Sequence, residues 1–179
     1  MTTELMNCYF CKGKKENSAV IYEDDFTYAV LDEGQDQRGY VLLILKQHRD
    51  TLFDANISAY ELMAFWRAAQ KIGNAQKKTL GAENVYAVTL CDGLRHFHVH
   101  LVPRYVWSDK DKERYRELFT ERDGEESVNA CIDKGLIGGF WYLADGERYY
   151  KETEFWKLSE GDKKNHLDYL TMLLKSAII

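Results

Sequence analysis

The residues His96-Phe97-His98-Val99-His100-Leu101-Val102-Pro103-Arg104 carry the strongest pattern in this chain. Histidines and apolar residues alternate along the segment, and this is the period of a β-strand. In a strand, the three histidines project from one face, while Phe97, Val99 and Leu101 project from the other. The alternation therefore predicts a strand with a core-facing side and an imidazole-bearing side, and Pro103 limits how far it can pair.

A row of imidazoles on one strand face indicates a chemical role. Neutral imidazole is a good nucleophile near neutral pH, and polar neighbours can fix its tautomer. Alternate residues of one strand can also share a metal ion. Three unrelated histidines on a solvated face are the remaining alternative, and they explain neither the common register nor the nearby Arg104. The pattern therefore favours a nucleophilic site, with a metal site as the rival.

The segment His96 to Arg104 resembles the signature of the histidine triad (HIT) family of nucleotide hydrolases and transferases. The family pattern is His-apolar-His-apolar-His-apolar-apolar, often followed by Pro-Arg, and it matches here without a gap. The resemblance implies that the middle histidine, His98, attacks the α-phosphorus of a nucleotide. We expect His100 to orient His98 and to stabilise charge on the phosphate oxygens, with His96 completing the catalytic set. No catalytic cofactor is expected, because the imidazole itself is the nucleophile.

A C-x-x-C pair near the N-terminus, Cys8 and Cys11, indicates a metal site or a redox pair. The redox interpretation is the weaker one, since no helix pattern opens at Cys8 to lower its pKa. In zinc-containing, bacterial-type HIT proteins, such a pair binds zinc together with the first triad histidine and a histidine that closes the strand before the long helix. Similarity to these members implies a structural zinc held by Cys8, Cys11, His48 and His96, a closed ligand set without a position for water.

The rest of the sequence predicts an α+β fold, a HIT-like antiparallel β-sheet of about five strands with a long helix. Besides the triad strand, apolar runs predict strands at residues 19–22, 26–31, 40–45 and 85–90. Ser58 and Glu61 form a capping box before a helix expected over residues 59–80, and Gly81 supplies its stop signal. The resemblance covers residues 1–105, the expected catalytic domain, and implies a homodimer that continues the sheet.

Three further residues are expected to contact a purine nucleotide. By resemblance, Asp32 accepts hydrogen bonds from the ribose hydroxyls, although it could simply end a strand. The segment 91–95 is shorter than the usual family loop and lacks its glutamine and the adjacent serine or threonine. Gly93 can let backbone N–H groups approach an anion, and Arg95 is a candidate to replace the missing phosphate donors.

Residues 106–179 predict a helical C-terminal extension packed on the domain. Helices are expected at residues 109–122 and 125–136, and leucines between 167 and 174 indicate a final amphipathic helix. Aromatic clusters lie at 140–142 and 155–156. Binding of a partner and a specificity lid over the nucleotide are the alternatives to simple packing.

Composition narrows the class of protein. The net charge of −5 and the lack of a Lys/Arg-rich run argue against binding to duplex nucleic acid. No apolar run approaches membrane-spanning length and no signal peptide is recognisable, so a cytoplasmic protein is expected. Four cysteines without a secretion signal then favour thiols or metal ligands over disulfides.

The sequence therefore predicts a nucleotide hydrolase that cleaves a phosphoramidate, ester or dinucleoside polyphosphate through a nucleotidyl-histidine. A nucleotidyltransferase or phosphorylase would use the same histidine. A nucleotide-binding adaptor with little turnover is the alternative from another class, favoured by the missing loop residues. A purely structural zinc protein would leave the triad face unexplained.

Overall fold

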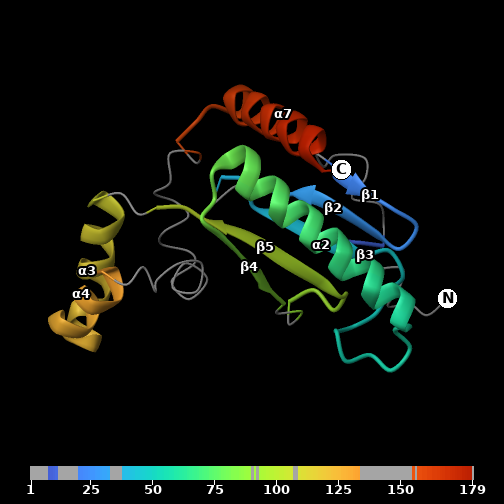
Figure 1. Cartoon of the computed structure of the whole chain (residues 1–179), viewed down its shortest axis with the longest axis horizontal. Coiled ribbons are helices and arrows are strands. Elements are labelled where there is room, and N and C mark those ends of the chain that lie inside the picture. Colours follow the sequence, from blue (N-terminus) through green and yellow to red (C-terminus); the bar gives the residue numbers. More distant parts are fainter. Residues whose placement is uncertain are drawn as a thin grey trace.

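An antiparallel five-stranded sheet with helices across one face forms the body of the protein (Figure 1). The computed structural model describes residues 8–11, 20–32, 38–89, 91, 93–106, 109–133, 155 and 157–178. The strands, in the sheet order β1-β2-β3-β5-β4, are β1 Val20–Glu23, β2 Thr27–Leu31, β3 Val41–Leu45, β4 Asn84–Val88 and β5 His98–Arg104. The predicted α+β class and strand number are confirmed.

The long helix α2, Ala59–Leu80, has the bounds that its sequence signals predict. The Ser58 hydroxyl accepts a hydrogen bond from the Glu61 N–H, and the Glu61 carboxylate accepts one from the Ser58 N–H in return. The helix ends at Gly81, whose φ of 75° is the left-handed conformation that glycine adopts without steric cost.

The two faces of the sheet have different roles. The face under α2 holds the main core, in which Phe65 of α2 stacks on Phe97 with ring centroids 4.6 Å apart. The opposite face carries a smaller apolar cluster around Phe10. Because β5 pairs with β3, His98 lies opposite Ile44 and His100 opposite Leu42, both members of that smaller cluster. The two imidazoles therefore lie on the face away from α2.

Strand β5 begins two residues later than the alternation predicts. The His96 N–H donates to the Leu94 carbonyl at 2.7 Å, and the Phe97 N–H donates to the Arg49 carbonyl. These bonds hold His96 in a turn ahead of the strand, so only His98 and His100 belong to the strand itself. The residue at which a strand starts depends on the hydrogen-bond partners of individual N–H groups, which side-chain alternation does not reveal.

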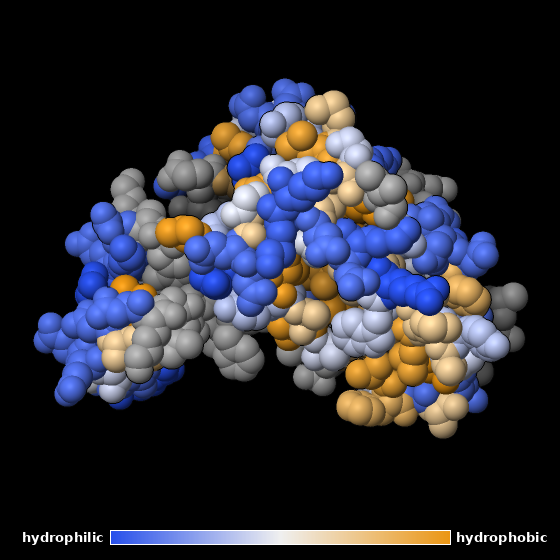
Figure 2. Space-filling model, in the orientation of Figure 1, coloured by the Kyte–Doolittle hydropathy of each residue, from blue (hydrophilic) through white to orange (hydrophobic). Residues whose placement is uncertain are grey.

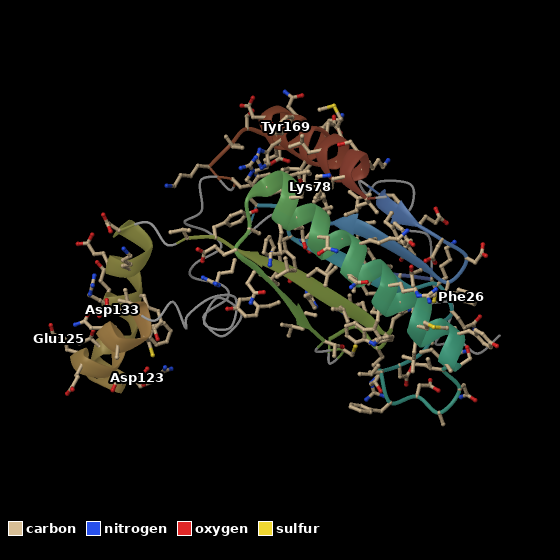
Figure 3. The ribbon with its side chains drawn as sticks, in the orientation of Figure 1. Phe26, Lys78, Asp123, Glu125, Asp133 and Tyr169 are labelled. Carbon is tan, nitrogen blue, oxygen red and sulfur yellow. The ribbon has the colours of Figure 1, made fainter. Side chains whose placement is uncertain are left out.

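The described part of the C-terminal extension is helical, as predicted. Helix α7, Glu160–Ala177, lies beside α2 on the same side of the sheet (Figure 1), and its Leu170 and Leu174 are fully buried in the main core. Figure 3 places Tyr169 on α7 above Lys78 at the C-terminal end of α2. Thus α7 shares the core of the sheet. Of the predicted aromatic clusters, residues 140–142 and 156 lie outside the described residues.

Helices α3, Asp109–Asp123, and α4, Glu125–Asp133, pack on each other beyond the end of the sheet (Figure 1). Their contact is a small apolar cluster of Tyr115, Phe119 and Val128. The extension therefore contributes to two separate hydrophobic clusters.

Hydrophobic surface gathers near the loop that precedes α2, while much of the remaining visible face is hydrophilic (Figure 2). Phe53 is 90% exposed and Tyr60 is 72% exposed in this region. Within the described residues, no helix combines the length and apolar character needed to cross a membrane.

Shortening a buried leucine of α7 tests whether this helix stabilises the whole sheet. Leu170→Ala is expected to lower the free energy of unfolding by about 2–5 kcal/mol, because it leaves a cavity in the main core. Met172→Ala, at a residue that is 59% exposed on the same helix, is the control and should change stability by less than about 0.5 kcal/mol. Urea unfolding measures both. Equal stabilities for the two variants would contradict a shared core.

Candidate functional site

His98 is buried on the sheet face opposite α2, and its tautomer is set by the backbone. Its Nδ1 lies 2.6 Å from the carbonyl oxygen of His96. A carbonyl can only accept a hydrogen bond, so Nδ1 carries the proton and donates it. In the neutral ring the lone pair is then on Nε2. This is the arrangement that a nucleophilic histidine requires.

His100 lies next to His98, with ring centroids 4.9 Å apart. The Tyr40 hydroxyl lies 2.5 Å from His100 Nδ1. The hydroxyl can donate to Nδ1, which places the His100 proton on Nε2 and makes that atom a hydrogen-bond donor. Burial, and secondarily the neighbouring His98 ring, lowers the pKa of His100 to about 4, so the ring is neutral near pH 7.

The lowered pKa of His100 predicts a loss of stability in acid. The unfolded chain binds a proton at His100 near pH 6.5, whereas the folded chain does so only near pH 4. The unfolded state therefore binds more protons between these values, and stability falls as the pH drops through them. Between pH 6.5 and 5 the loss is expected to be about 1–2 kcal/mol.

Urea unfolding of wild type and His100→Asn at both pH values measures this effect. The variant lacks the titrating ring, so its stability should depend less steeply on pH by that amount. Groups that do not contact His100 are the same in both proteins, so the comparison isolates this ring and its immediate neighbours. Parallel pH profiles for the two proteins would contradict the assignment.

The four residues expected to bind zinc converge in space. One ligand atom from each of Cys8, Cys11, His48 and His96 lies within 4.8 Å of all the others. The Nε2 of His96 lies 2.6 Å from the Leu45 carbonyl, so Nε2 donates and the lone pair is on Nδ1. This Nδ1 faces the Cys8 and Cys11 sulfurs at 3.2 and 3.4 Å. The ring is thus oriented to coordinate through Nδ1.

His48 repeats the arrangement. Its Nδ1 lies 3.3 Å from the Cys11 sulfur, and its Nε2 lies 3.3 Å from the Asp50 carboxylate. A carboxylate or carbonyl usually accepts a hydrogen bond from the non-coordinating nitrogen of a metal-bound histidine and so orients the ring. Burial and the neighbouring Cys8 raise the pKa of the Cys11 thiol to about 11. Near pH 7 this thiol therefore loses its proton only when a cation is bound, and two sulfurs with two imidazole nitrogens are a donor set that fits a tetrahedral zinc.

The residues expected to contact the nucleotide are more scattered. Asp32 is half-buried and comes directly after β2. Its N–H donates a hydrogen bond to the carbonyl of Tyr40, whose hydroxyl in turn contacts His100. Gly93 and Arg95 are exposed in the turn that leads to His96. A methyl group added at Gly93 would meet no atom within 4 Å, so the fold itself does not require glycine there. Its role toward a phosphate stays a prediction.

Three residues that contact His98 or His100 were missed by the sequence analysis: Phe10, Tyr40 and Cys91. The Phe10 ring lies 4.9 Å from the His98 ring. Cys91 is buried, with a φ of 53°, and its sulfur lies 4.0 Å from His98 Nδ1. For Tyr40 the signal was its place directly before a buried strand, but the register of β3 against β5 was needed to interpret it.

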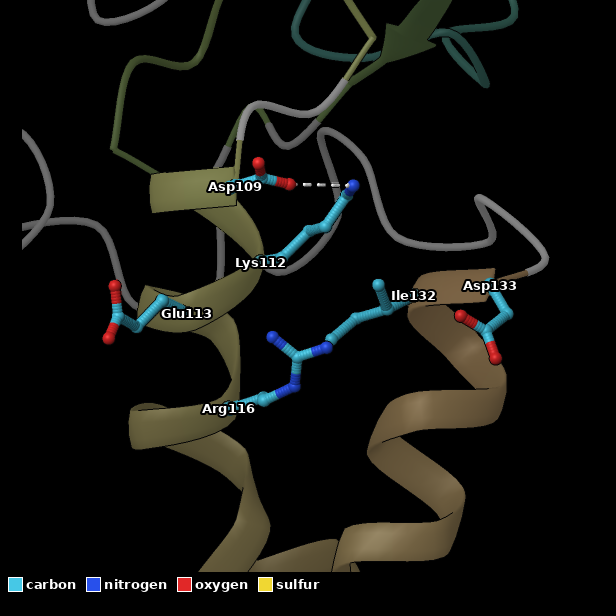
Figure 4. A pocket seen from close by; sticks show the side chains of 6 residues that line it. All are labelled: Asp109, Lys112, Glu113, Arg116, Ile132 and Asp133. Atoms are coloured by element: carbon cyan, nitrogen blue, oxygen red, sulfur yellow. Dashed lines mark hydrogen bonds and ion pairs between the residues drawn. The ribbon is translucent and has the colours of Figure 1, made fainter.

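A separate open pocket of about 670 Å³ lies between α3 and α4 (Figure 4). Its side chains are mostly charged, and Lys112 is paired with Asp109 at 3.1 Å. The lining residues are Asp109, Lys112, Glu113, Arg116, Ile132 and Asp133. No triad or cysteine residue lines it, so it is distinct from the histidine site.

Comparisons with family models, curated sequences and solved structures all match this chain to HIT proteins. The sequence profile of the HIT domain matches residues 14–106. An uncharacterised HIT-like protein from Borreliella burgdorferi is 30% identical over 110 residues, which cover 56% of this chain and 78% of that protein. Protein hit from Bacillus subtilis is 29% identical over 110 residues, covering 58% and 74%. A solved hypothetical histidine triad nucleotide-binding protein from Sulfolobus tokodaii has the same fold, with a TM-score of 0.61 over 96% of this chain and 91% of that one, at 18% identity.

Proposed function

The chain belongs to the HIT family, and from this premise we propose that it is a nucleotide hydrolase in which His98 is the nucleophile. The substrate is a nucleoside phosphoramidate, phosphate ester or dinucleoside polyphosphate that is cleaved at its α-phosphorus. The observation that carries the proposal is the hydrogen bond from His98 Nδ1 to the His96 carbonyl, which puts the lone pair of the neutral ring on Nε2.

In the first step, His98 Nε2 attacks the α-phosphorus and forms a nitrogen–phosphorus bond. The bond to the leaving group breaks, and the leaving group departs with its electron pair and takes up a proton from solvent. The imidazole then carries positive charge, and the hydrogen bond that Nδ1–H donates to the His96 carbonyl oxygen stabilises that charge. This backbone acceptor is fixed before the reaction, so it stabilises the charged intermediate without reorganisation.

In the second step, water attacks the phosphorus and the electron pair of the nitrogen–phosphorus bond returns to Nε2. The nucleoside monophosphate leaves, and the proton lost by water passes to solvent. His100, neutral and able to donate from Nε2, is suited to stabilise a non-bridging phosphate oxygen in both steps. Asp32 is proposed to hold the ribose hydroxyls, and Gly93 and Arg95 the phosphates.

Zinc bound by Cys8, Cys11, His48 and His96 would be structural. It would supply a cross-link between the N-terminal segment, the end of β3 and the turn before β5. A homodimer that continues the sheet is also proposed, in line with the family.

Product analysis tests the proposed reaction. Purified protein is incubated with adenosine-5′-phosphoramidate or a diadenosine polyphosphate, with and without added phosphate, and the products are separated by chromatography. Release of AMP that is independent of added phosphate supports the hydrolase. Products that incorporate phosphate indicate a transferase instead. Nucleotide binding without turnover of any such substrate would overturn the proposal in favour of an adaptor.

A further inference from the structure

Phe10 lies between the cysteine pair and the nucleophile. It stands in the sequence between the two cysteines, and its side chain is only 4% exposed. Its ring centroid lies 4.9 Å from that of His98 and 5.5 Å from that of His96. One buried aromatic ring therefore contacts both the proposed nucleophile and a proposed metal ligand.

The position of Phe10 is fixed from two sides. Its carbonyl accepts a hydrogen bond from the buried Tyr28 hydroxyl at 3.1 Å, which ties the loop to β2. Its side chain packs in the cluster that includes Ile44, the residue opposite His98 in the sheet. A further constraint on the loop is the pair of cysteines, whose sulfurs face His48 and His96. Holding those sulfurs on one cation would hold the Phe10 ring against His98.

From this arrangement we propose that Phe10 is a positioning residue, which transmits occupancy of the Cys8–Cys11–His48–His96 site to the orientation of the His98 ring. The inference rests on the proposed function for its effect on turnover. Its structural part, the coupling of the cation site to the His98 ring, stands independently of any reaction. The His96 carbonyl fixes one edge of the His98 ring by a hydrogen bond, and the Phe10 ring limits its rotation by contact.

The test compares wild type with Phe10→Ala, Phe10→Leu and Tyr9→Ala. Tyr9 is the neighbouring aromatic of the same loop and is 47% exposed, so it controls for general disturbance of the loop. Imidazole signals are recorded by NMR before and after chelation of the metal, and the His98 signal is identified by its loss in His98→Asn. Bound zinc is measured in each protein, since Phe10 supplies no ligand atom and its variants should retain the metal.

In wild type and Tyr9→Ala, chelation is expected to shift the His98 signal. In Phe10→Ala, the signal should already be displaced with zinc bound, and chelation should move it less than half as far. The kcat of Phe10→Ala should fall about tenfold with KM within about twofold, because the nucleophile is misplaced while the binding groups remain. Phe10→Leu fills most of the same space and should recover kcat to within about threefold of wild type.

Equal chelation shifts in wild type and Phe10→Ala, or an unchanged kcat in Phe10→Ala, would overturn the inference. If Phe10→Ala does not fold, the test rests on wild type. In that case, a His98 signal that does not shift on chelation of wild type also overturns the inference. The NMR measurement needs no turnover. A protein that hydrolyses none of the substrates would therefore disprove the proposed function and still leave the coupling open to this test.

Discussion

His98→Asn is expected to reduce turnover of adenosine-5′-phosphoramidate by at least about a thousandfold, the largest effect of any single change considered for this protein. The asparagine amide nitrogen can take the place of Nδ1 and donate to the His96 carbonyl, so the buried acceptor keeps its partner. No atom of asparagine replaces Nε2. The variant should therefore fold and bind nucleotide while it lacks the nucleophile.

Binding and chemistry are measured separately to establish this. Affinity for AMP, measured by calorimetry, should stay within about threefold of wild type, while AMP release from substrate is followed by chromatography. His100→Asn is the matched control on the same strand face. It removes a stabilising group and keeps the nucleophile, so it should slow turnover about 10- to 100-fold and still form a covalent nucleotidyl adduct. Full turnover by His98→Asn, or an adduct on another residue, would refute the mechanism.

The sequence was sufficient to predict the parts of the fold that depend on local patterns. Alternation from His96 onward predicted β5 and its two faces, and the capping box with Gly81 predicted both ends of α2. These signals act over a few residues, through side-chain periodicity and satisfaction of backbone groups. Residue identity alone is enough to locate them.

The contacts around His98 could not be predicted in this way, because they depend on strand order and register. The sheet places β3 beside β5, and only that pairing brings Tyr40 to His100 across 60 positions of sequence. Phe10 reaches His98 because residues 8–11 lie against that face of the sheet, a placement that no local pattern encodes. The start of β5 was misplaced for the same reason, since the Phe97 N–H bonds to Arg49 in a distant loop.

The metal cluster is an intermediate case. Its residues came from resemblance to zinc-containing HIT proteins, and the fold brings all four together. The coordinating atoms did not follow from sequence. Both histidines turn Nδ1 toward the sulfurs because the Leu45 carbonyl and the Asp50 carboxylate hold their Nε2 atoms. Which ring nitrogen would coordinate the proposed metal is therefore set by acceptors that become neighbours only on folding.

Removal of the metal is expected to produce the second large effect, on stability. A ligand that binds only the folded state at about 1,000 times its dissociation constant stabilises it by about 4 kcal/mol. For a chain of this length that corresponds to a melting temperature about 8–16 °C higher. Chelation should therefore lower the melting temperature of wild type by this amount, and protein purified without chelators should contain about one zinc per chain.

Cys8→Ser combined with Cys11→Ser should melt at the temperature of chelated wild type and show no further response to chelator. Cys131→Ser is the control, because that thiol lies on α4 among the side chains of the α3–α4 cluster, outside the metal-binding set. It should retain the zinc and the full chelation response. Because the four ligands come from the N-terminal segment, the end of β3 and the turn before β5, the destabilisation should spread beyond the cysteine loop. Hydrogen exchange would then show faster exchange at the Leu45 and Phe97 amides, which bond across this junction, whereas protection unchanged there would limit the metal to the loop alone.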